Sequence, residues 1–288
     1  MQSGLCIPRN KDDSTAMKDQ LARRLARLYA AVFAKPRFVN FHYALLKVAL
    51  RGIGVMNYYD RSVSGEDFFI NRLLPHLVQS SSPVLFDIGA NQGEYALLLA
   101  KQFPGARIFA FEPHPKNFEA LTKSNIPNLS PYPLALSNQS GETLLYDRAD
   151  DDGSTNASLH SNVITDLYGK RTIAHPVKVK TLDEVTASLH IDFIDFLKMD
   201  VEGGELAILQ GAHQLIEEER VGVIQFEFNE MNIISRSFLH DFRKLLPNYR
   251  IFRLLPESLL PVAEDPLLSE IFGFQNLVAI LQNGSRDF

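Results

Sequence analysis

Short apolar runs alternate with longer amphipathic stretches along most of the chain. Runs typical of buried strands occur at 84–88, 107–111, 132–136, 193–199, 223–228, 250–254 and 276–281. Stretches with apolar residues at helical spacing occur at 64–79, 94–102, 115–124, 205–219 and 237–246. Strands separated by helices predict an α/β fold whose mostly parallel sheet is covered on both faces.

A polar stretch, residues 137–175, interrupts this alternation. It holds an apparent strand at 143–146 and the acidic loop ADDDGSTNAS, and a further strand is expected at 177–180. Such a loop either closes over a bound ligand or lies on the surface without a role.

The first 63 residues have a different character, and we expect them to form a tail and helical extension beside a domain of residues 64–288. Helices are expected at 16–34 and 41–51. The first is amphipathic, with an apolar face and a basic face. The apolar face carries Leu21, Leu25, Leu28 and Val32. The basic residues Arg23, Arg24 and Arg27 lie mostly on another face. Two interpretations stay open: a helix on a membrane surface, or one that packs over the domain.

Composition narrows the class of protein. The 288 residues are 45% hydrophobic and 22% charged, which is typical of a globular chain. A net charge of −5 gives no electrostatic reason to expect a nucleic-acid partner. The single cysteine, Cys6, cannot form an internal disulfide, so a cytoplasmic location is expected. We expect no transmembrane segment, because no stretch reaches about 18 uncharged apolar residues.

The most informative segment is LFDIGANQGEY, residues 85–95, where an apolar strand ends in Asp87 and a glycine-rich turn precedes a helix. Glycines allow positive φ and let a ligand approach the backbone. The free N–H groups at the start of a helix favour an anionic group. A helix start beside a carboxylate suits a zwitterion, such as the amino-acid end of S-adenosylmethionine.

The next predicted strand ends in Glu112, nineteen residues after Gly93. A carboxylate there can accept hydrogen bonds from both ribose hydroxyls of a nucleoside. This spacing alone does not separate NAD from S-adenosylmethionine. The glycine pattern argues against NAD. In the dinucleotide fingerprint, G-x-G-x-x-G/A, successive marker positions are two and then three residues apart, whereas Gly89 and Gly93 are four apart.

Five segments occur in an order that resembles the FkbM family of S-adenosylmethionine-dependent methyltransferases. They are FDIGANQGEY, AFEPHPKNFEAL, ALSNQSGE, VKVKTLDE and IDFLKMDVEGGELAILQGA. The resemblance implies a class I methyltransferase (Rossmann-like) fold, with seven strands of which the last is antiparallel. It also implies O-methylation of a sugar, glycolipid or natural product. The cofactor-binding residues expected from it are Asp87, Gly89, Ala90, Asn91, Gly93, Glu112 and Pro113.

Candidate catalytic residues lie where the strand at 193–199 ends. Lys198, Asp200 and Glu202 have the period-two spacing that places side chains on one side of an extended chain. A hydroxyl acceptor must lose a proton, which Asp200 or Glu202 could take. The alternative for Glu202 is an acid that interacts with the start of a helix.

Other possibilities remain at this stage. Glu227, Asn229 and Glu230 could hold magnesium together with Asp200, although we expect no metal ligands. His114 is expected to pack near the cofactor rather than to act as a base. His160 and His175 lie in the polar stretch and could face the substrate, but we expect both in an exposed loop. The alternatives to a methyltransferase are a non-catalytic nucleoside-binding module and an NAD-dependent oxidoreductase. A small-molecule or glycan acceptor is the expected partner, and the sequence leaves the oligomeric state open.

Overall fold

The computed structural model describes residues 13–282 of the chain, and its side chains from residue 20 onward. Cys6 lies outside the described residues. The chain divides into two compact units, the first ending at Leu50 and the second beginning at Arg51. The domain boundary expected between residues 63 and 64 stays a prediction.

The first unit consists of helices, as its sequence pattern predicts. They are α1 (Asp13–Phe33), the 3₁₀ turn η1 (Pro36–Phe38) and α2 (Val39–Gly52). The Tyr29 hydroxyl on α1 lies 2.9 Å from Nε2 of His42 on α2. The α1–η1–α2 segment therefore folds back on itself at Pro36.

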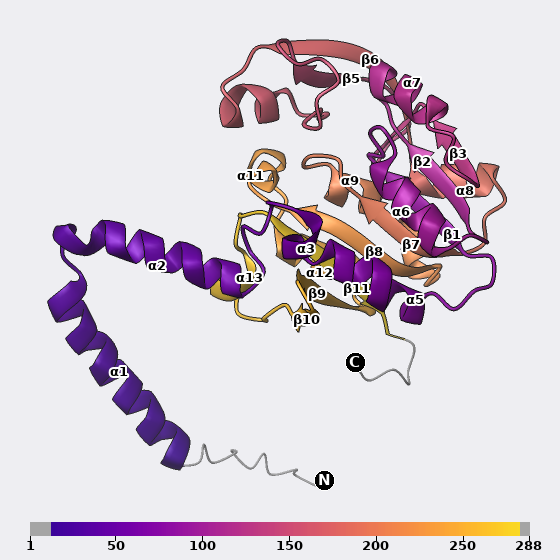
Figure 1. Cartoon of the computed structure of the whole chain (residues 1–288). Coiled ribbons are helices and arrows are strands. Elements are labelled where there is room, and N and C mark those ends of the chain that lie inside the picture. The colour runs from indigo at the N-terminus through magenta and orange to yellow at the C-terminus, as the bar shows by residue number, and fades with distance from the viewer. Residues whose placement is uncertain (1–12, 283–288) are drawn as a thin grey trace, which may run out of the picture. The chain divides into compact units, whose positions relative to one another are not determined.

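The second unit is built on a mostly parallel sheet of eight strands (Figure 1). The strands are β1 (Val84–Ile88), β2 (Arg107–Phe111), β3 (Leu129–Tyr132), β7 (Ile194–Met199), β8 (Val221–Phe228), β9 (Tyr249–Leu255), β10 (Ser258–Pro261) and β11 (Gln275–Leu281). Their order is β10-β9-β11-β8-β7-β1-β2-β3. The last strand, β11, is antiparallel to both β8 and β9, as the class I methyltransferase fold requires.

The expected count of seven strands is one too low. The additional strand, β10, forms an antiparallel hairpin with β9 at the edge of the sheet, with Ser258 opposite Leu255. Its sequence, SLLP, ends in Pro261, which an edge strand tolerates because one of its sides needs no backbone partner.

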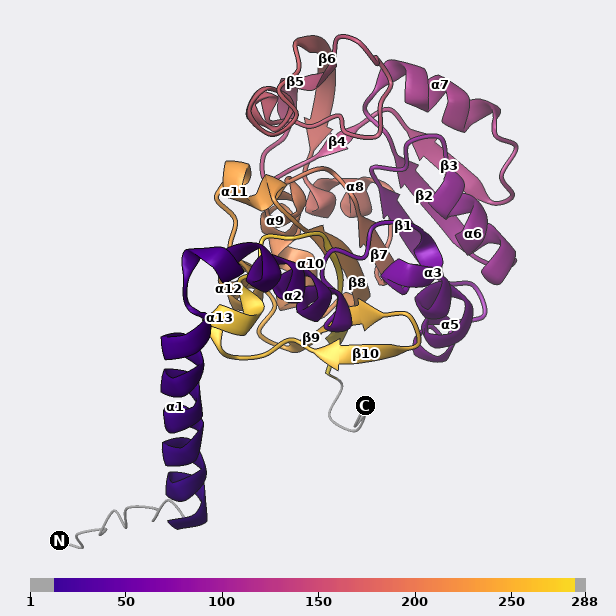
Figure 2. The ribbon, with the colours of Figure 1, turned by 60° about the vertical axis from the view of Figure 1, so that its left-hand side comes forward.

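Helices cover both faces of the sheet (Figures 1 and 2). The α-helices of the second unit are α3 (Arg61–Ser64), α4 (Glu66–Phe68), α5 (Leu74–Leu77), α6 (Glu94–Gln102), α7 (Pro115–Lys123), α8 (Leu182–Ser188), α9 (Glu205–Gln210), α10 (His213–Glu217), α11 (Met231–Ser235), α12 (Leu239–Leu245) and α13 (Pro266–Ser269). Two π-helical segments, η2 (Phe69–Leu73) and η3 (Val163–Leu167), complete the set.

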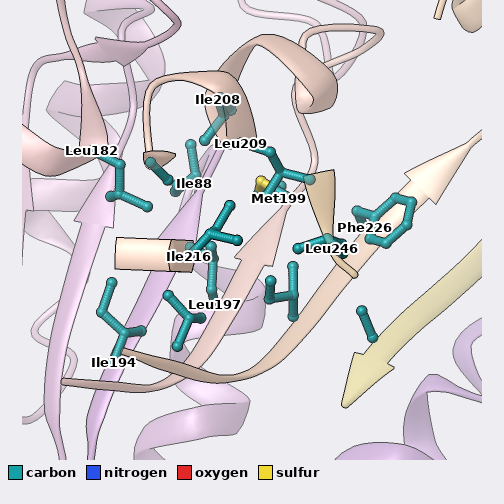
Figure 3. Close-up of a cluster of buried hydrophobic side chains, with 14 of the residues drawn as sticks. Ile88, Leu182, Ile194, Leu197, Met199, Ile208, Leu209, Ile216, Phe226 and Leu246 are labelled. Carbon is teal, nitrogen blue, oxygen red and sulfur yellow. The ribbon is translucent and has the colours of Figure 1, made fainter. Parts of the chain in front are cut away.

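Alternate strand residues enter two different cores. On one face, Phe86, Leu197 and Ile224 pack against α8, α9, α10 and α12. Figure 3 shows Leu197 in this cluster with Leu182 and Ile216. On the other, Leu85 and Phe196 pack against η2, α5 and α6. Both faces are apolar, which is why these strands read as continuous hydrophobic runs rather than as alternating ones.

The polar insert forms a second, three-stranded sheet. It consists of β4 (Ala135–Leu136), β5 (Gly141–Arg148) and β6 (Thr172–Lys180) in the order β4-β6-β5. The single strand expected at 132–136 is wrong: β3 ends at Tyr132 in the large sheet, and β4 belongs to the small one. Pro133 stands between them and has no N–H with which to continue a ladder.

The helix expected at 205–219 is broken at Gly211, between α9 and α10. A Cβ at Gly211 would lie 2.1 Å from the carbonyl oxygen of Ser137. This close approach brings the start of the insert against the helical layer.

The strand order reverses beside β1. The chain proceeds from β1 outward to β2 and β3, and then returns to β7 on the other side of β1. The carboxyl ends of β1 and β7 therefore flank the switch point, where ligands bind in open α/β sheets. Across residues 13–282, no helix combines the length and apolar character needed to cross a bilayer.

The core assignment generates a stability prediction. Phe226 is fully buried and stacks on Phe242, with ring centroids 4.7 Å apart. Phe226→Ala should lower the free energy of unfolding by about 3–5 kcal/mol, because it leaves a cavity between sheet and helix. Phe193→Ala is the matched control: Phe193 is 41% exposed, and its loss should cost less than about 1 kcal/mol. Equal losses in urea titrations would contradict this assignment of the core.

Candidate active site

A cavity of about 430 Å³ opens at the switch point. That volume lies within the range of small-molecule sites. Of the residues expected from the sequence, seven line it: Gly89, Ala90, Asn91, Glu112, Pro113, Asp200 and Glu202. Asp87 and Gly93 do not form part of its wall.

The turn after β1 is held against the backbone that follows β7. Gly89 has φ +78°, and its N–H donates to the carbonyl of Phe111, 2.9 Å away. A Cβ at Gly89 would lie only 1.8 Å from the backbone oxygen of Asp200. Gly89 is therefore required by a backbone contact inside the protein, which also places the turn at the cavity.

Gly93 has a different function in the same turn. It precedes α6 with φ +93°, and a Cβ there would lie 2.7 Å from both Leu121 Cδ1 and Ile126 Cδ1. Its lack of a side chain serves the packing of α6 against α7 and the chain that follows it.

Glu112 is buried at the end of β2 and is held by two backbone donors. The N–H of Asn91 donates to one carboxylate oxygen at 2.8 Å, and the N–H of His114 donates to the other at 2.7 Å. Asn91 adopts a left-handed conformation, φ +48°, that points its N–H at Glu112. Burial raises the pKa of Glu112 to about 7, because these two hydrogen bonds offset desolvation only in part.

Asp87 lies beneath the cavity rather than on its wall. Its side chain is fully buried, and neither carboxylate oxygen has a well-aligned hydrogen-bond donor. The nearest cation is Lys198, whose Nζ is 3.8 Å from Asp87 Oδ1. Burial raises the pKa of Asp87, although Lys198 acts in the opposite direction.

Lys198 links Asp87 to the cavity. Its Nζ lies 3.1 Å from Asp200 Oδ2 and 4.6 Å from the centre of the Tyr95 ring. Burial alone would lower the pKa of Lys198, but nearby carboxylates, with Asp200 and Asp87 foremost, outweigh it and raise that pKa. Lys198 is therefore a charged group that holds Asp200 at the end of β7.

The segment after Asp200 is a tight turn. Glu202 has φ +56° and lines the cavity. Burial, followed by the charges of Asp200 and Glu205, raises the pKa of Glu202 well above its usual range. The insert contacts this turn, because Ser158 Oγ donates to the backbone oxygen of Glu202 at 2.8 Å.

Glu205, which sequence reasoning did not select, holds that turn in shape. Its Oε1 accepts from the N–H of Val201 at 3.1 Å and from the N–H of Gly203 at 3.4 Å. Burial raises the pKa of Glu205 to about 7. The signal that could have found it is the third acid of the DVEGGE segment, placed at the start of α9.

Glu66 and Tyr95 also line the cavity and were missed. The Tyr95 hydroxyl donates to Gln225 Oε1 at 2.5 Å, and Gln225 Nε2 donates to Glu66 Oε1 at 3.1 Å. A polar Gln225 inside the apolar strand VGVIQFEF is the available sequence signal. Burial raises the pKa of Glu66, although Lys198 lowers it in part.

The acidic loop of the insert closes one side of the cavity. Ser154, Thr155 and Ala157 belong to its wall. Asp152 fastens this loop, because its Oδ1 lies 3.1 Å from Nε2 of His114 and 2.7 Å from Nε2 of His175.

Three side chains therefore meet beside the loop: His114, Asp152 and His175. Among the side chains that the structure describes, residues 20–282, these are the His, Cys, Asp and Glu groups close enough to share an ion. Asp200, Glu227 and Glu230 do not form such a group. Lys116 also pairs with the Asp152 carboxylate, so the cluster is already compensated by charge. His114 is fully buried near Glu112, and His175 contributes to this cluster instead of standing alone in a loop.

The sequence matches the model of the methyltransferase FkbM domain over residues 87–252, more than half of the chain. The protein therefore belongs to the FkbM methyltransferase family, whose members depend on S-adenosylmethionine. This membership confirms the resemblance found in the sequence and disfavours both a non-catalytic module and an NAD-dependent oxidoreductase.

Three curated relatives of the chain are named as methyltransferases. The 2-O-methyltransferase NoeI of Sinorhizobium fredii is 24% identical over 66% of this chain and 81% of its own length. The hexuronic acid methyltransferase AglP of Haloferax volcanii is 29% identical over 57% of this chain and 64% of its own length. The methyltransferase sdnD of Sordaria araneosa is 28% identical over 46% of this chain and 62% of its own.

Solved structures are more distant. The plantazolicin methyltransferase BpumL, in complex with S-adenosylhomocysteine, is 14% identical, with a TM-score of 0.42 over 89% of this chain and 94% of that one. The O-methyltransferase from Bacillus cereus, in complex with the same molecule, is 12% identical, with a TM-score of 0.38 over 90% and 97%.

The close approach at Gly89 generates a prediction with an internal control. Gly89→Ala should destabilise the protein both by backbone strain and by its collision with the Asp200 carbonyl. Gly169 also has a positive φ, +63°, but nothing lies within 4 Å of a Cβ there. Gly169→Ala should cost about 1–2 kcal/mol from strain alone. Gly89→Ala should cost at least about 1–3 kcal/mol more. Equal unfolding free energies for the two variants would contradict the contact.

Proposed function

We propose that the protein transfers the methyl group of S-adenosylmethionine to a hydroxyl group of a sugar, and that glycans or glycolipids are its acceptor class. The observation that carries this proposal is the placement of Asp200 and Glu202 on the wall of the same cavity as Glu112 and the Gly89 turn. The proposed proton acceptors and the proposed ribose-binding carboxylate thus line one cavity.

The residues present fit the cofactor. Both Glu112 oxygens are fixed by backbone N–H groups and still have free lone pairs, as a ribose-binding carboxylate needs. Gly89, Ala90 and Asn91 give the wall next to Glu112 little side-chain bulk, and Pro113 adds an apolar surface there. Asp87 would act indirectly, by holding Lys198. Gly93 would act through the packing of α6.

The bound cofactor supplies an electrophilic methyl group on a good, neutral leaving group. The protein must hold an acceptor oxygen in line with that group and receive the hydroxyl proton. Asp200 would orient or deprotonate the hydroxyl, with Lys198 fixing the carboxylate at 3.1 Å. Glu202 has a raised pKa, so its ionised form would be a stronger base than an ordinary carboxylate.

The sugar acceptor is supported by the relatives. NoeI is named as a 2-O-methyltransferase and AglP as a hexuronic acid methyltransferase. The lone cysteine remains the support for a cytoplasmic location, which we retain as part of the proposal.

The function is tested in two stages with the full-length protein. Calorimetry with S-adenosylmethionine, S-adenosylhomocysteine and NAD should show binding of the first two and none of NAD. A screen with methyl-labelled S-adenosylmethionine should then transfer label to a sugar hydroxyl. Label transferred only to amine or carboxyl acceptors would overturn the O-methylation proposal while leaving the cofactor assignment in place.

The raised pKa of Glu112 generates a pH prediction. Ionised Glu112 should accept ribose hydroxyls better than the protonated form does. With a pKa of about 7, affinity for S-adenosylhomocysteine should rise about tenfold between pH 6 and pH 8, following the ionised fraction. Glu112→Gln should bind more weakly and lose this dependence. A wild-type profile that is flat, or a dependence that survives in Glu112→Gln, would assign the effect to another group.

Asp200→Asn should separate chemistry from binding. If Asp200 handles the acceptor proton, single-turnover methyl transfer at saturating cofactor should fall by about 10²–10⁴-fold. Affinity for S-adenosylhomocysteine should change much less, since the proposed contacts come from β1 and β2. Glu202→Gln should reduce the rate less if that residue mainly serves the start of α9. Full activity of Asp200→Asn would transfer the proton-accepting role to Glu202 or Glu227.

A further inference from the structure

The charge of the chain is divided unevenly. Residues 20–59 contain seven arginines and lysines and neither aspartate nor glutamate. The remaining residues hold 22 basic and 34 acidic residues, and so carry a net charge of −12. A basic segment on an otherwise acidic protein indicates a negatively charged partner for that segment alone.

The basic segment includes most of α1, which exposes an apolar stripe. Leu21, Leu25, Leu28 and Val32 recur at helical spacing and are 59%, 58%, 65% and 43% exposed. Arg23, Arg24 and Arg27 lie to the side and rear of this stripe on the helical projection. An exposed apolar face on a helix whose other faces carry arginines is typical of a helix that lies in the plane of a membrane surface.

The second helix, α2, exposes still more apolar surface. Phe41, Tyr43, Leu46 and Val48 are 56%, 61%, 53% and 68% exposed, and no residue of α2 is buried. These side chains point in several directions around the helix, so one neighbouring helix could not cover them all. Neither α1 nor α2 is suited to crossing a bilayer. For α1, whose apolar residues form one stripe, an interfacial position accounts for exposed apolar side chains on a helix that does not cross a bilayer.

We propose that the α1–η1–α2 segment binds the surface of an anionic lipid bilayer. The apolar side chains would enter the boundary between headgroups and acyl chains, while the arginine and lysine stems extend toward the phosphates. Charge complementarity selects anionic lipids over neutral ones. The acidic remainder of the protein would be repelled from that surface, which leaves this segment as the contact. Binding to lipid does not depend on the proposed acceptor.

The test uses the full-length protein and sedimentation with vesicles. Binding should be at least about tenfold tighter to vesicles containing phosphatidylglycerol than to phosphatidylcholine alone, and should weaken as salt is added. The triple variant Arg23→Gln, Arg24→Gln, Arg27→Gln should lose about a hundredfold in apparent affinity for the anionic vesicles, because each basic residue near the surface contributes about fivefold. Leu25→Ser combined with Leu28→Ser should also weaken binding.

The matched control removes three positive charges from the second unit. Lys101, Lys178 and Lys180 are exposed, and their combined change to glutamine should leave vesicle binding unchanged. S-adenosylhomocysteine calorimetry on every variant checks that the second unit remains folded. Failure of the wild type to bind anionic vesicles, or an equal loss in the control, would overturn the proposal. So would a stable dimer, seen by light scattering, that Leu25→Ser and Leu28→Ser dissociate, since a second copy would then cover this face.

Discussion

The site depends on the close approach of two backbone segments at the centre of the sheet. Gly89, after β1, lies so near the carbonyl of Asp200, after β7, that a single added carbon would be 1.8 Å from that oxygen. The hydrogen bond from the Asp200 N–H to the Ile88 carbonyl, 3.0 Å long, joins the same two segments. The contact brings the turn next to Glu112 and the acids after β7 to the wall of one cavity.

Lys198 is the cation that offsets the negative charges of the carboxylates around that contact. Its ammonium lies among the carboxylates of Asp87, Asp200, Glu66 and Glu227, all of which raise its pKa. Asp87, buried and without a well-aligned hydrogen bond, needs a nearby cation most. Removing the lysine would leave several acids uncompensated near one another. Asp87 lies 3.8 Å from the Lys198 ammonium and is not part of the cavity wall; its direct contact with the cofactor stays a prediction.

The insert between β4 and β6 adds a wall to the cavity that is less general than the strands of the common fold. Asp152 holds the acidic loop to His114 and His175, and Ser158 fastens the same region to the turn at Glu202. Thus a segment that interrupts the regular alternation of strands and helices reaches both the Glu112 side and the Asp200 side of the cavity. Such a wall is a suitable place for acceptor selectivity, because the strands that carry the turn and the acids are common to the fold.

The sequence by itself determined the strand–turn–helix at residues 84–102, the acid at the end of β2 and the acids after β7. These features depend on neighbours a few residues apart, so periodicity and turn chemistry reveal them. The hairpin of β9 and β10 and the break at Gly211 were not visible, because an edge strand and a close backbone contact leave weak local patterns. Only the tertiary structure decided that Tyr95 meets Gln225, 130 residues away, that Gln225 meets Glu66, and that Glu205 supports the turn after Asp200. Which strands become neighbours is set by how a whole sheet buries both of its faces, and no local spacing encodes that.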